Sequence, residues 1–235
     1  MLSKLLYKEF KLALLHPWLA AHTVGHSLCY GIKHHIKRRI SAHYYLVLIP
    51  NYPMYVLFFY NTLGIFFICL SGRENHDFAY SLSLPIRKRD AVRARIVFAV
   101  ILQLAQCVLA VGFMFTRRTL GLGANEAGMD PNVAFFGLSF IMLAVFNYVF
   151  FTGYFSQPDK VGRVFARASI VTFVYIGIAE ACTFAVPFFR DVLDTPDPEN
   201  MGVKFIVLAI GAAIYGLTSY MAYRISAKKF EVLDM

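Results

Sequence analysis

The sequence predicts an all-α membrane protein, a polytopic bundle of helices, from three observations. Of its 235 residues, 58% are hydrophobic and only 16% are charged, which is outside the range of ordinary soluble domains. Five apolar runs are each long enough to cross about 30 Å of hydrocarbon at about 1.5 Å per residue. Short polar loops separate the runs, and cations gather in alternate loops. With no internal repeat or long linker, residues 1–235 are expected to form a single membrane domain.

The first element, residues 1–17, is predicted to be an amphipathic elbow helix along the inner membrane surface. Its leucines can share one side, while Lys4, Lys8 and Lys11 reach lipid headgroups. These charges interrupt the apolar core that a cleavable signal peptide would need. The alternative is a short helix buried against the protein's own core.

Residues 18–52 are an atypical basic segment that has to supply the first of six spans if the elbow helix and the loop 73–95 both lie inside. Lys33, Lys37 and the pair at 38–39 would together cost about 12 kcal/mol at the bilayer centre. If they mark the inner interface, residues 40–50 give only about 16 Å of helix for a crossing of about 30 Å. This segment is therefore predicted to form a short or tilted first span, or not to cross the membrane at all.

The five clear spans follow in the rest of the chain. They are predicted at residues 53–71, 96–116, 133–155, 168–189 and 204–223. With the loop 73–95 inside, the segments 117–132 and 190–203 lie outside, and 156–167 and the tail from 224 lie inside. The inner segments are basic and 190–203 is acidic, as the positive-inside rule expects, although Arg117 and Arg118 depart from it. Pro187 is expected to kink or end its helix.

The loop 73–95 carries the most specific pattern in the chain. Pro85 can start a helix, and the residues from Asp90 can continue it as a short surface helix that leads into the next span. The leading L-Y-K-E-F, the loop motif N-x-D-F-x-Y-S-L-S-L-P-I-R-K-R-D and the closing S-A-K-K-F-E resemble the permease subunits of bacterial type 2 ATP-binding-cassette (ABC-2) exporters. The resemblance covers residues 1–17 and 49–235 and fails between Trp18 and Leu48. A substitution, an insertion or a frame slip would each give that gap.

The resemblance implies a multi-pass permease of the bacterial cytoplasmic (plasma) membrane that works with separate cytoplasmic ATPase subunits. The chain contains no G-x-x-x-x-G-K-[ST] loop, so no cofactor is expected in it, and ATP and Mg²⁺ would bind to the partner. The chain would be a transport subunit and not an enzyme, would pair with itself or a second permease in the bilayer, and would move an amphipathic or lipid-like substrate outward. Peptide, lipid, antibiotic and ion all stay open as substrates. A non-transporting immunity or scaffold subunit is one alternative.

The resemblance also implies that the loop holds a coupling helix that docks in a groove of the ATPase. The docking residues carried over by position are Asp77, Tyr80, Ser81, Leu84, Pro85, Ile86, Arg87, Asp90 and Arg93. Leu84 and Ile86 would form the apolar anchor, and the charged residues would fix the orientation. The alternative is that the basic residues only set topology, which explains Arg73 and Arg95 but not the apolar residues between charges.

Polar residues inside the apolar runs are further candidates for function. Glu180 lies in the middle of its run, where a carboxyl group is costly unless it is neutral, paired or facing a polar cavity. Asn61 and Asn147 are possible functional residues as well, although amides between helices more often serve as hydrogen-bonding contacts. The small residues 211–213 and Gly216 would allow close helix packing, within the chain or across a dimer.

His22 and His26 are weak candidates for a metal site. Their i, i+4 spacing places both imidazoles on one helix face, which is the basis for a second alternative, a membrane-embedded metal-dependent enzyme. The chain lacks the further histidine clusters of such enzymes, and the nearby cations would repel a metal ion, so no metal site is predicted. No nucleic-acid partner is expected, because the basic residues flank apolar spans and form no known binding motif.

Overall fold

The computed structural model describes residues 7, 54–74, 87–119, 125 and 128–232. Within these residues it contains helices and turns and no strand. The long helices are α5 (Tyr55–Glu74), α7 (Lys88–Thr119), α8 (Val133–Tyr154), α9 (Val161–Ala185) and α10 (Met201–Glu231). A 3₁₀ turn, Pro158–Lys160, precedes α9, and a π-helical turn, Phe189–Leu193, follows it. The predicted all-α fold is confirmed. The predicted elbow helix and the segment 18–52 lie outside the described residues, apart from Tyr7.

All five long helices are long and apolar enough to cross a membrane, so the chain is a multi-pass membrane protein. Their ends differ from the predicted spans. The surface helix expected before residue 96 and the span after it form one continuous helix, α7. α9 begins at Val161, earlier than expected, and ends at Ala185. It stops there because Pro187 lacks a backbone N–H and disfavours a helical residue before it.

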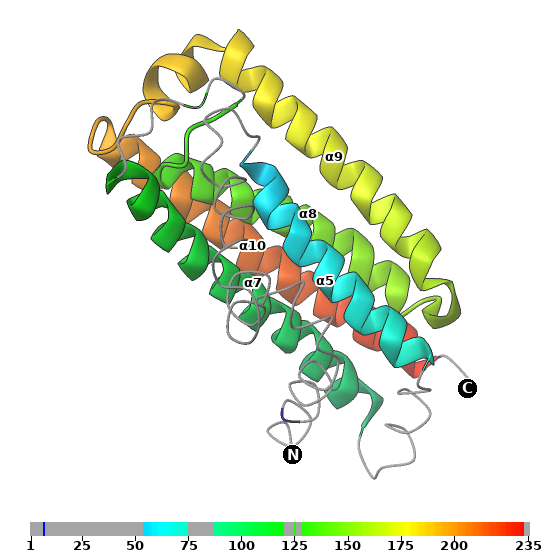
Figure 1. The fold of residues 1–235 in the computed structure, drawn as a ribbon. Helices are drawn as coiled ribbons and strands as arrows, with labels where there is room; N and C mark the ends of the chain where they lie inside the picture. Colours follow the sequence, from blue (N-terminus) through cyan, green and yellow to red (C-terminus); the bar gives the residue numbers. More distant parts are fainter. Residues whose placement is uncertain (1–6, 8–53, 75–86, 120–124, 126–127, 233–235) are drawn as a thin grey trace, which may run out of the picture.

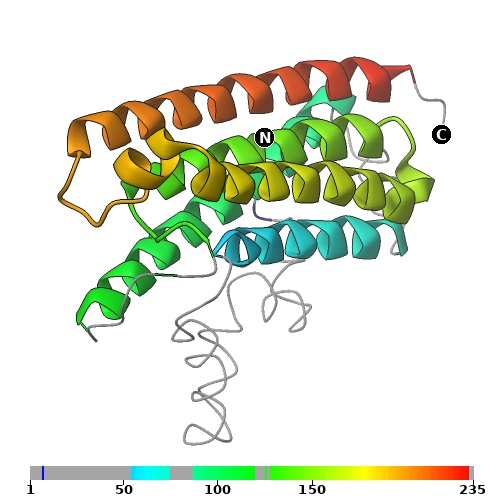
Figure 2. The same ribbon diagram turned by 90° about the horizontal axis from the view of Figure 1, so that it is seen from above.

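α8 is the central helix of the bundle (Figures 1 and 2). It contacts each of the other four long helices. Of the 18 residues in its most apolar stretch, 67% are buried inside the protein, against 17% in the corresponding stretch of α10. α10 lies directly against α8. This close approach depends on two glycines, because a Cβ atom on Gly211 would lie only 2.1 Å from the carbonyl oxygen of Gly137. Ala212, Ala213 and Gly216 are exposed on the other side of α10.

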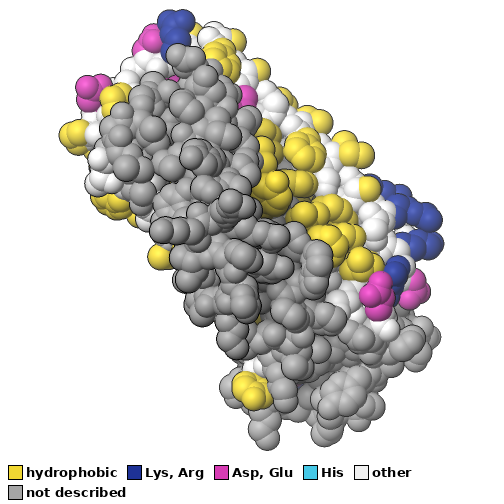
Figure 3. All heavy atoms as spheres, viewed as in Figure 1, with side chains coloured by type: hydrophobic (Ala, Val, Ile, Leu, Met, Phe, Trp, Pro, Cys, Tyr) yellow, Lys and Arg dark blue, Asp and Glu magenta, His cyan; other side chains and the backbone are white. Residues whose placement is uncertain are grey.

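The outward faces of the bundle are apolar. Large hydrophobic side chains are exposed along α9, among them Ile170, Phe173 and Ile178, and along α10, including Ile206 and Leu217. Figure 3 shows hydrophobic side chains gathered along the α9 side of the bundle, with charged side chains toward its two ends. Such a band suits contact with lipid tails, because its backbone groups are already bonded within helices.

Candidate functional site

The charges define two ends of the bundle. One end carries the C-terminus of α5, the start of α7, the turn before α9 and the C-terminus of α10 (Figure 1). Within the described ranges its cations are Arg73, Arg87, Lys88, Arg89, Arg93, Arg95, Lys160, Arg163, Arg167, Arg224, Lys228 and Lys229, and its acids are Glu74, Asp90, Asp159 and Glu231. Among the residues whose side chains the structure describes, the opposite end carries Asp130, Asp191, Asp194, Asp197 and Glu199, with Arg190 and Lys204. By the positive-inside rule the first is the inner end and the second is the outer end.

The structure places three of the predicted docking residues, all at the start of α7. Arg87 and Arg93 are exposed, and Asp90 is half-buried. Arg87 lies just before the helix, and its carbonyl oxygen accepts the first helical hydrogen bond, from the Asp90 N–H at 2.9 Å. The other docking candidates, Asp77, Tyr80, Ser81, Leu84, Pro85 and Ile86, lie outside the described residues, as do His22 and His26.

Hydrogen bonds connect the segments of the inner end to one another. Arg89 at the start of α7 forms a two-point ion pair with Glu231 at the end of α10, with 2.9 Å between Nη2 and Oε2. Arg73 at the end of α5 donates to the Asp159 carbonyl oxygen at 3.1 Å. The two helices that flank the loop 75–86 are therefore joined to α10 and to the turn before α9.

Buried amides join the helices at mid-depth. Gln103 of α7 and Asn147 of α8 exchange two hydrogen bonds of 2.8 and 2.9 Å between their side chains. The Tyr215 hydroxyl of α10 donates to Gln103 Oε1 at 2.6 Å. Asn61 of α5 donates to the Leu102 carbonyl oxygen at 3.2 Å. Both candidate asparagines therefore hydrogen-bond across helices, which is the commoner role of amides in a membrane protein.

Glu180 lies near the outer end of α9 and not at mid-span, because α9 begins and ends earlier than the predicted span. Its Oε2 accepts a hydrogen bond from the Met129 N–H at 3.2 Å. Gly128 lies flat against the carboxylate, since an added Cβ atom would come within 2.3 Å of Oε2. The segment before α8 therefore packs against this carboxylate, and a larger residue at position 128 would require the Glu180 side chain to shift.

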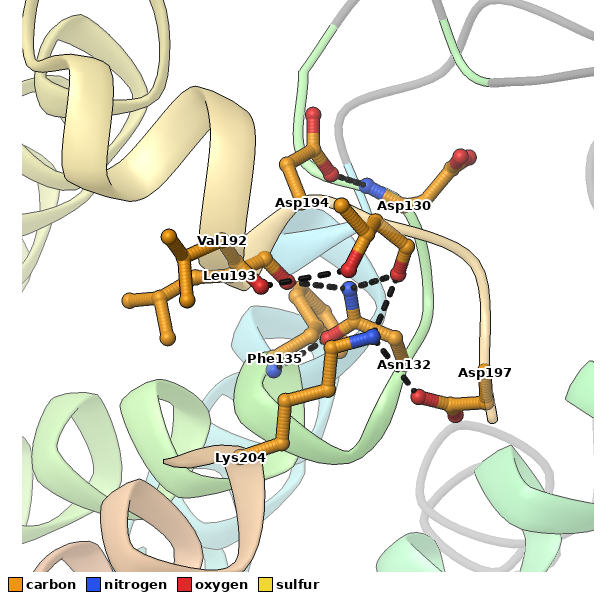
Figure 4. Close-up of polar contacts among 9 residues, drawn as sticks. Asp130, Asn132, Phe135, Val192, Leu193, Asp194, Asp197 and Lys204 are labelled. Carbon is orange, nitrogen blue, oxygen red and sulfur yellow. Dashed lines mark hydrogen bonds and ion pairs between the residues drawn. The ribbon is translucent and has the colours of Figure 1, made fainter. Parts of the chain in front are cut away.

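Three segments of the outer end are bonded into one unit, which we call the outer lid: residues 128–132, residues 189–197 and the start of α10. Asn132 accepts from the Phe135 N–H as the N-cap of α8 and donates to the Leu193 carbonyl oxygen at 2.7 Å (Figure 4). The Asp130 N–H donates to Asp194 Oδ1 at 2.7 Å. Burial raises the pKa of Asp194 to about 6.

Lys204 completes the outer lid. It is fully buried, and its Nζ donates to the Thr195 carbonyl oxygen at 2.5 Å and to Asp197 Oδ1 at 3.0 Å (Figure 4). The sequence did not single out these residues. An asparagine directly before an apolar run is a helix N-cap signal that could have found Asn132. No sequence pattern pairs Lys204 with Asp197 or joins Asp194 to Asp130.

Metal ligands do not gather in the part of the chain that the structure describes, where no group of three His, Cys, Asp or Glu side chains could hold a metal ion. Cys69, Cys107 and Cys182 form no disulfide bond within the described residues.

A family model described as an ABC-2 family transporter protein matches residues 33–231. The match spans all five long helices. It also includes residues 33–48, which the sequence patterns left outside the resemblance, and does not include residues 1–17. Neither the curated proteins nor the solved structures gave a match to this chain.

Proposed function

The chain belongs to the ABC-2 family of transporter proteins, and we propose that it is the permease subunit of an exporter in the bacterial cytoplasmic membrane. Separate cytoplasmic ATPase subunits would bind ATP and Mg²⁺, because the sequence has no phosphate-binding loop of its own. The permease would move an amphipathic or lipid-like substrate outward. An apolar substrate of this kind suits spans whose amides are already engaged with one another.

The continuity of α7 is the observation that carries the proposal. α7 runs for 32 residues without a break, about 48 Å, from the docking residues at the inner end to the outer end. A displacement of the loop 75–86 by the ATPase would act directly on this helix. Gln103 would pass the displacement to α8 and α10 through its bonds with Asn147 and Tyr215.

ATP binding would close the ATPase subunits and favour one of two arrangements of the spans, inward-open or outward-open. Such a shift needs an ATPase contact that differs in energy between the two arrangements. The exposed Arg87 and Arg93 can supply it by pairing with acidic side chains of the ATPase. Two permeases would form the pathway, and the exposed small residues of α10, including Ala213 and Gly216, support close pairing of identical or homologous chains.

Co-purification with the cognate ATPase tests the docking assignment. The double variant Leu84→Asp with Arg87→Asp should lose the ATPase, because it removes the apolar anchor and reverses a contact charge. Arg163→Asp is the matched control, since Arg163 is an exposed cation of the other inner loop outside the docking set, and this variant should keep the ATPase. Full assembly and transport by the double variant would refute the assignment.

A further inference from the structure

Two buried polar atoms under the outer lid have no hydrogen-bond partner among the described residues. They are the hydroxyl of Tyr55 at the start of α5 and Oε1 of Glu180 on α9. Tyr55 is 0% exposed, and it lies within electrostatic range of the carboxylates of Glu180 and Asp194. A buried polar group without a partner costs about 1–3 kcal/mol. A ligand that bonds to both atoms would remove that cost.

The Glu180 carboxylate is held in place by backbone. The Met129 N–H holds Oε2, and Gly128 packs against the whole carboxyl group. A carboxylate that a hydrogen bond already restrains loses less freedom when a ligand binds to its other oxygen, which favours affinity. The outer lid that contacts Glu180 is itself held together by the hydrogen bonds of Asn132 and Asp194.

The charge around this position is negative. Asp194 and Asp130 lie next to each other within the outer lid, and the Asp194 pKa of about 6 leaves it mostly ionised at neutral pH. Among the cations whose side chains the structure places at this end, Lys204 is bonded to Asp197 and Arg190 to Asp191. Glu180 Oε1, which has no hydrogen-bond partner among the described residues, is therefore suited to the positive charge of a ligand.

The residue types near this position favour an organic cation over a metal ion. No group of three metal-ligating side chains occurs within the described residues. Tyr55 packs against Phe135 with 4.8 Å between ring centroids, and Phe58 lies next to the same ring at 5.8 Å. Tyr55, which lies within electrostatic range of Glu180, therefore belongs to an aromatic cluster, and aromatic rings attract ammonium groups that carry apolar substituents.

We propose that Glu180, Tyr55 and Asp194 form a binding site for an alkylammonium group under the outer lid. The Glu180 carboxylate would accept hydrogen bonds from the ammonium, the Tyr55 hydroxyl oxygen would accept another, and the alkyl chain would lie in the apolar cluster around Phe135. The role of this site in export rests on the proposed function, whereas binding of the ammonium group itself needs no ATPase. The ammonium can belong to an exported amphiphile or to the headgroup of phosphatidylethanolamine.

Equilibrium dialysis of n-octylammonium against the purified full chain in a non-ionic detergent tests the site. Saturable binding is expected for the unchanged protein. Glu180→Gln should weaken it about tenfold or more, because a charged hydrogen bond is worth about 1.5–3 kcal/mol. Tyr55→Phe keeps the ring packing and should weaken binding about threefold to tenfold. Asp191→Asn, which changes an exposed carboxylate at the same end, is the matched control and should leave binding unchanged.

Competition identifies the source of the ammonium. Displacement of the probe by phosphatidylethanolamine but not by phosphatidylglycerol would assign the site to a lipid headgroup, and no displacement by either lipid would assign it to a soluble or exported amine. Absence of saturable binding by the unchanged protein, or equal affinity of Glu180→Gln and Asp191→Asn, would overturn the proposal. A chain that binds the probe but never retains an ATPase would instead count against the proposed function alone.

Discussion

At the outer end Lys204 is bonded to Asp197 with side chains 0% and 5% exposed, whereas at the inner end Arg89 is bonded to Glu231 with side chains 60% and 35% exposed. The outer pair joins α10 to the segment before it, and the inner pair joins the start of α7 to the end of α10. The outer pair is out of contact with water, so its attraction is weakly screened and its loss would leave a buried charge. The inner pair lies in water, where such attraction is weak.

The other polar contacts at the two ends differ in burial in the same way. The outer lid joins three segments through buried or half-buried bonds at Asn132, Asp194 and Lys204. The inner end leaves most of its cations exposed, including Arg87, Arg93 and Arg163, while Arg95 is buried. The outer end is therefore arranged as a closed structural unit, and the inner end as a charged surface that another protein can contact. Variants of matched residues at the two ends can break or sharpen this comparison.

Lys204→Met should cause the largest loss of stability. It removes the cation bonded to a buried Asp197 and the donor to the Thr195 carbonyl oxygen, which should cost about 3–5 kcal/mol. Chemical denaturation of the purified protein in detergent measures this loss. Adding Asp197→Asn to the variant should recover part of it, because both charges are then gone. The matched control is Arg190→Met, whose partner Asp191 is exposed, and no resolvable change is expected.

Asn132→Ala should cause a smaller loss at the same end. It removes the N-cap bond to Phe135 and the bonds to the 193–195 segment, which should cost about 1–2 kcal/mol by the same measurement. Asn200→Gly is the matched control. Asn200 precedes α10 with φ of 54° and makes no side-chain cap bond, and glycine adopts this left-handed conformation freely. Equal losses for both variants would mean that the lid bonds of Asn132 add nothing.

Sequence patterns located the spans better than their ends. Each apolar run became a long helix, because hydrophobicity alone identifies a crossing. The predicted span 168–189 excluded residues 161–167, where Arg163 and Arg167 lower the hydropathy, yet both residues favour a helix and α9 includes them. The residues before position 96 were predicted to form a separate short surface helix leading into the next span, whereas the structure joins both into one helix from Lys88. Hydropathy detects burial in lipid and not the continuation of a helix into water.

The sequence identified individual polar residues inside the spans, but it did not identify the residues with which they form hydrogen bonds. Glu180 was identified as a costly intramembrane acid, but its bond to Met129 joins residues 51 positions apart. Asn147 was identified as an intramembrane amide, but its partner Gln103 comes from another helix, and the Tyr215 hydroxyl that completes their network comes from a third. A single sequence shows which residue needs a partner. Which residue supplies it is decided by how the helices cross.

Asp194 should make the outer lid dependent on pH. Burial, with Asp130 nearby, raises the pKa of Asp194 from its usual 3.8 to about 6, against the opposing effects of the Asp130 N–H and Lys204. The folded protein then holds this proton more tightly than the unfolded chain. The contribution of this group to stability is full below about pH 4 and is lost as the pH rises through about 6.

The expected effect is modest, because Asp194 is only half-buried and solvent screens part of the shift. The denaturation midpoint of the unchanged protein should fall between about pH 4 and pH 7 by more than that of Asp194→Asn, which cannot titrate. Parallel pH profiles for the two proteins would show that Asp194 is not held in a low-polarity environment.

The ion pair of the inner end should have the smallest effect on stability. Arg89→Glu places two carboxylates together where Arg89 and Glu231 now pair, yet both side chains are exposed and can turn into water, so no resolvable change in the denaturation midpoint of the isolated chain is expected. The double variant Arg89→Glu with Glu231→Arg restores the opposite charges and serves as the control for changes unrelated to the pair. A loss as large as that of Lys204→Met, recovered in the double variant, would show that the inner end is locked as firmly as the outer lid. The contrast between a structural end and a docking end would then fail.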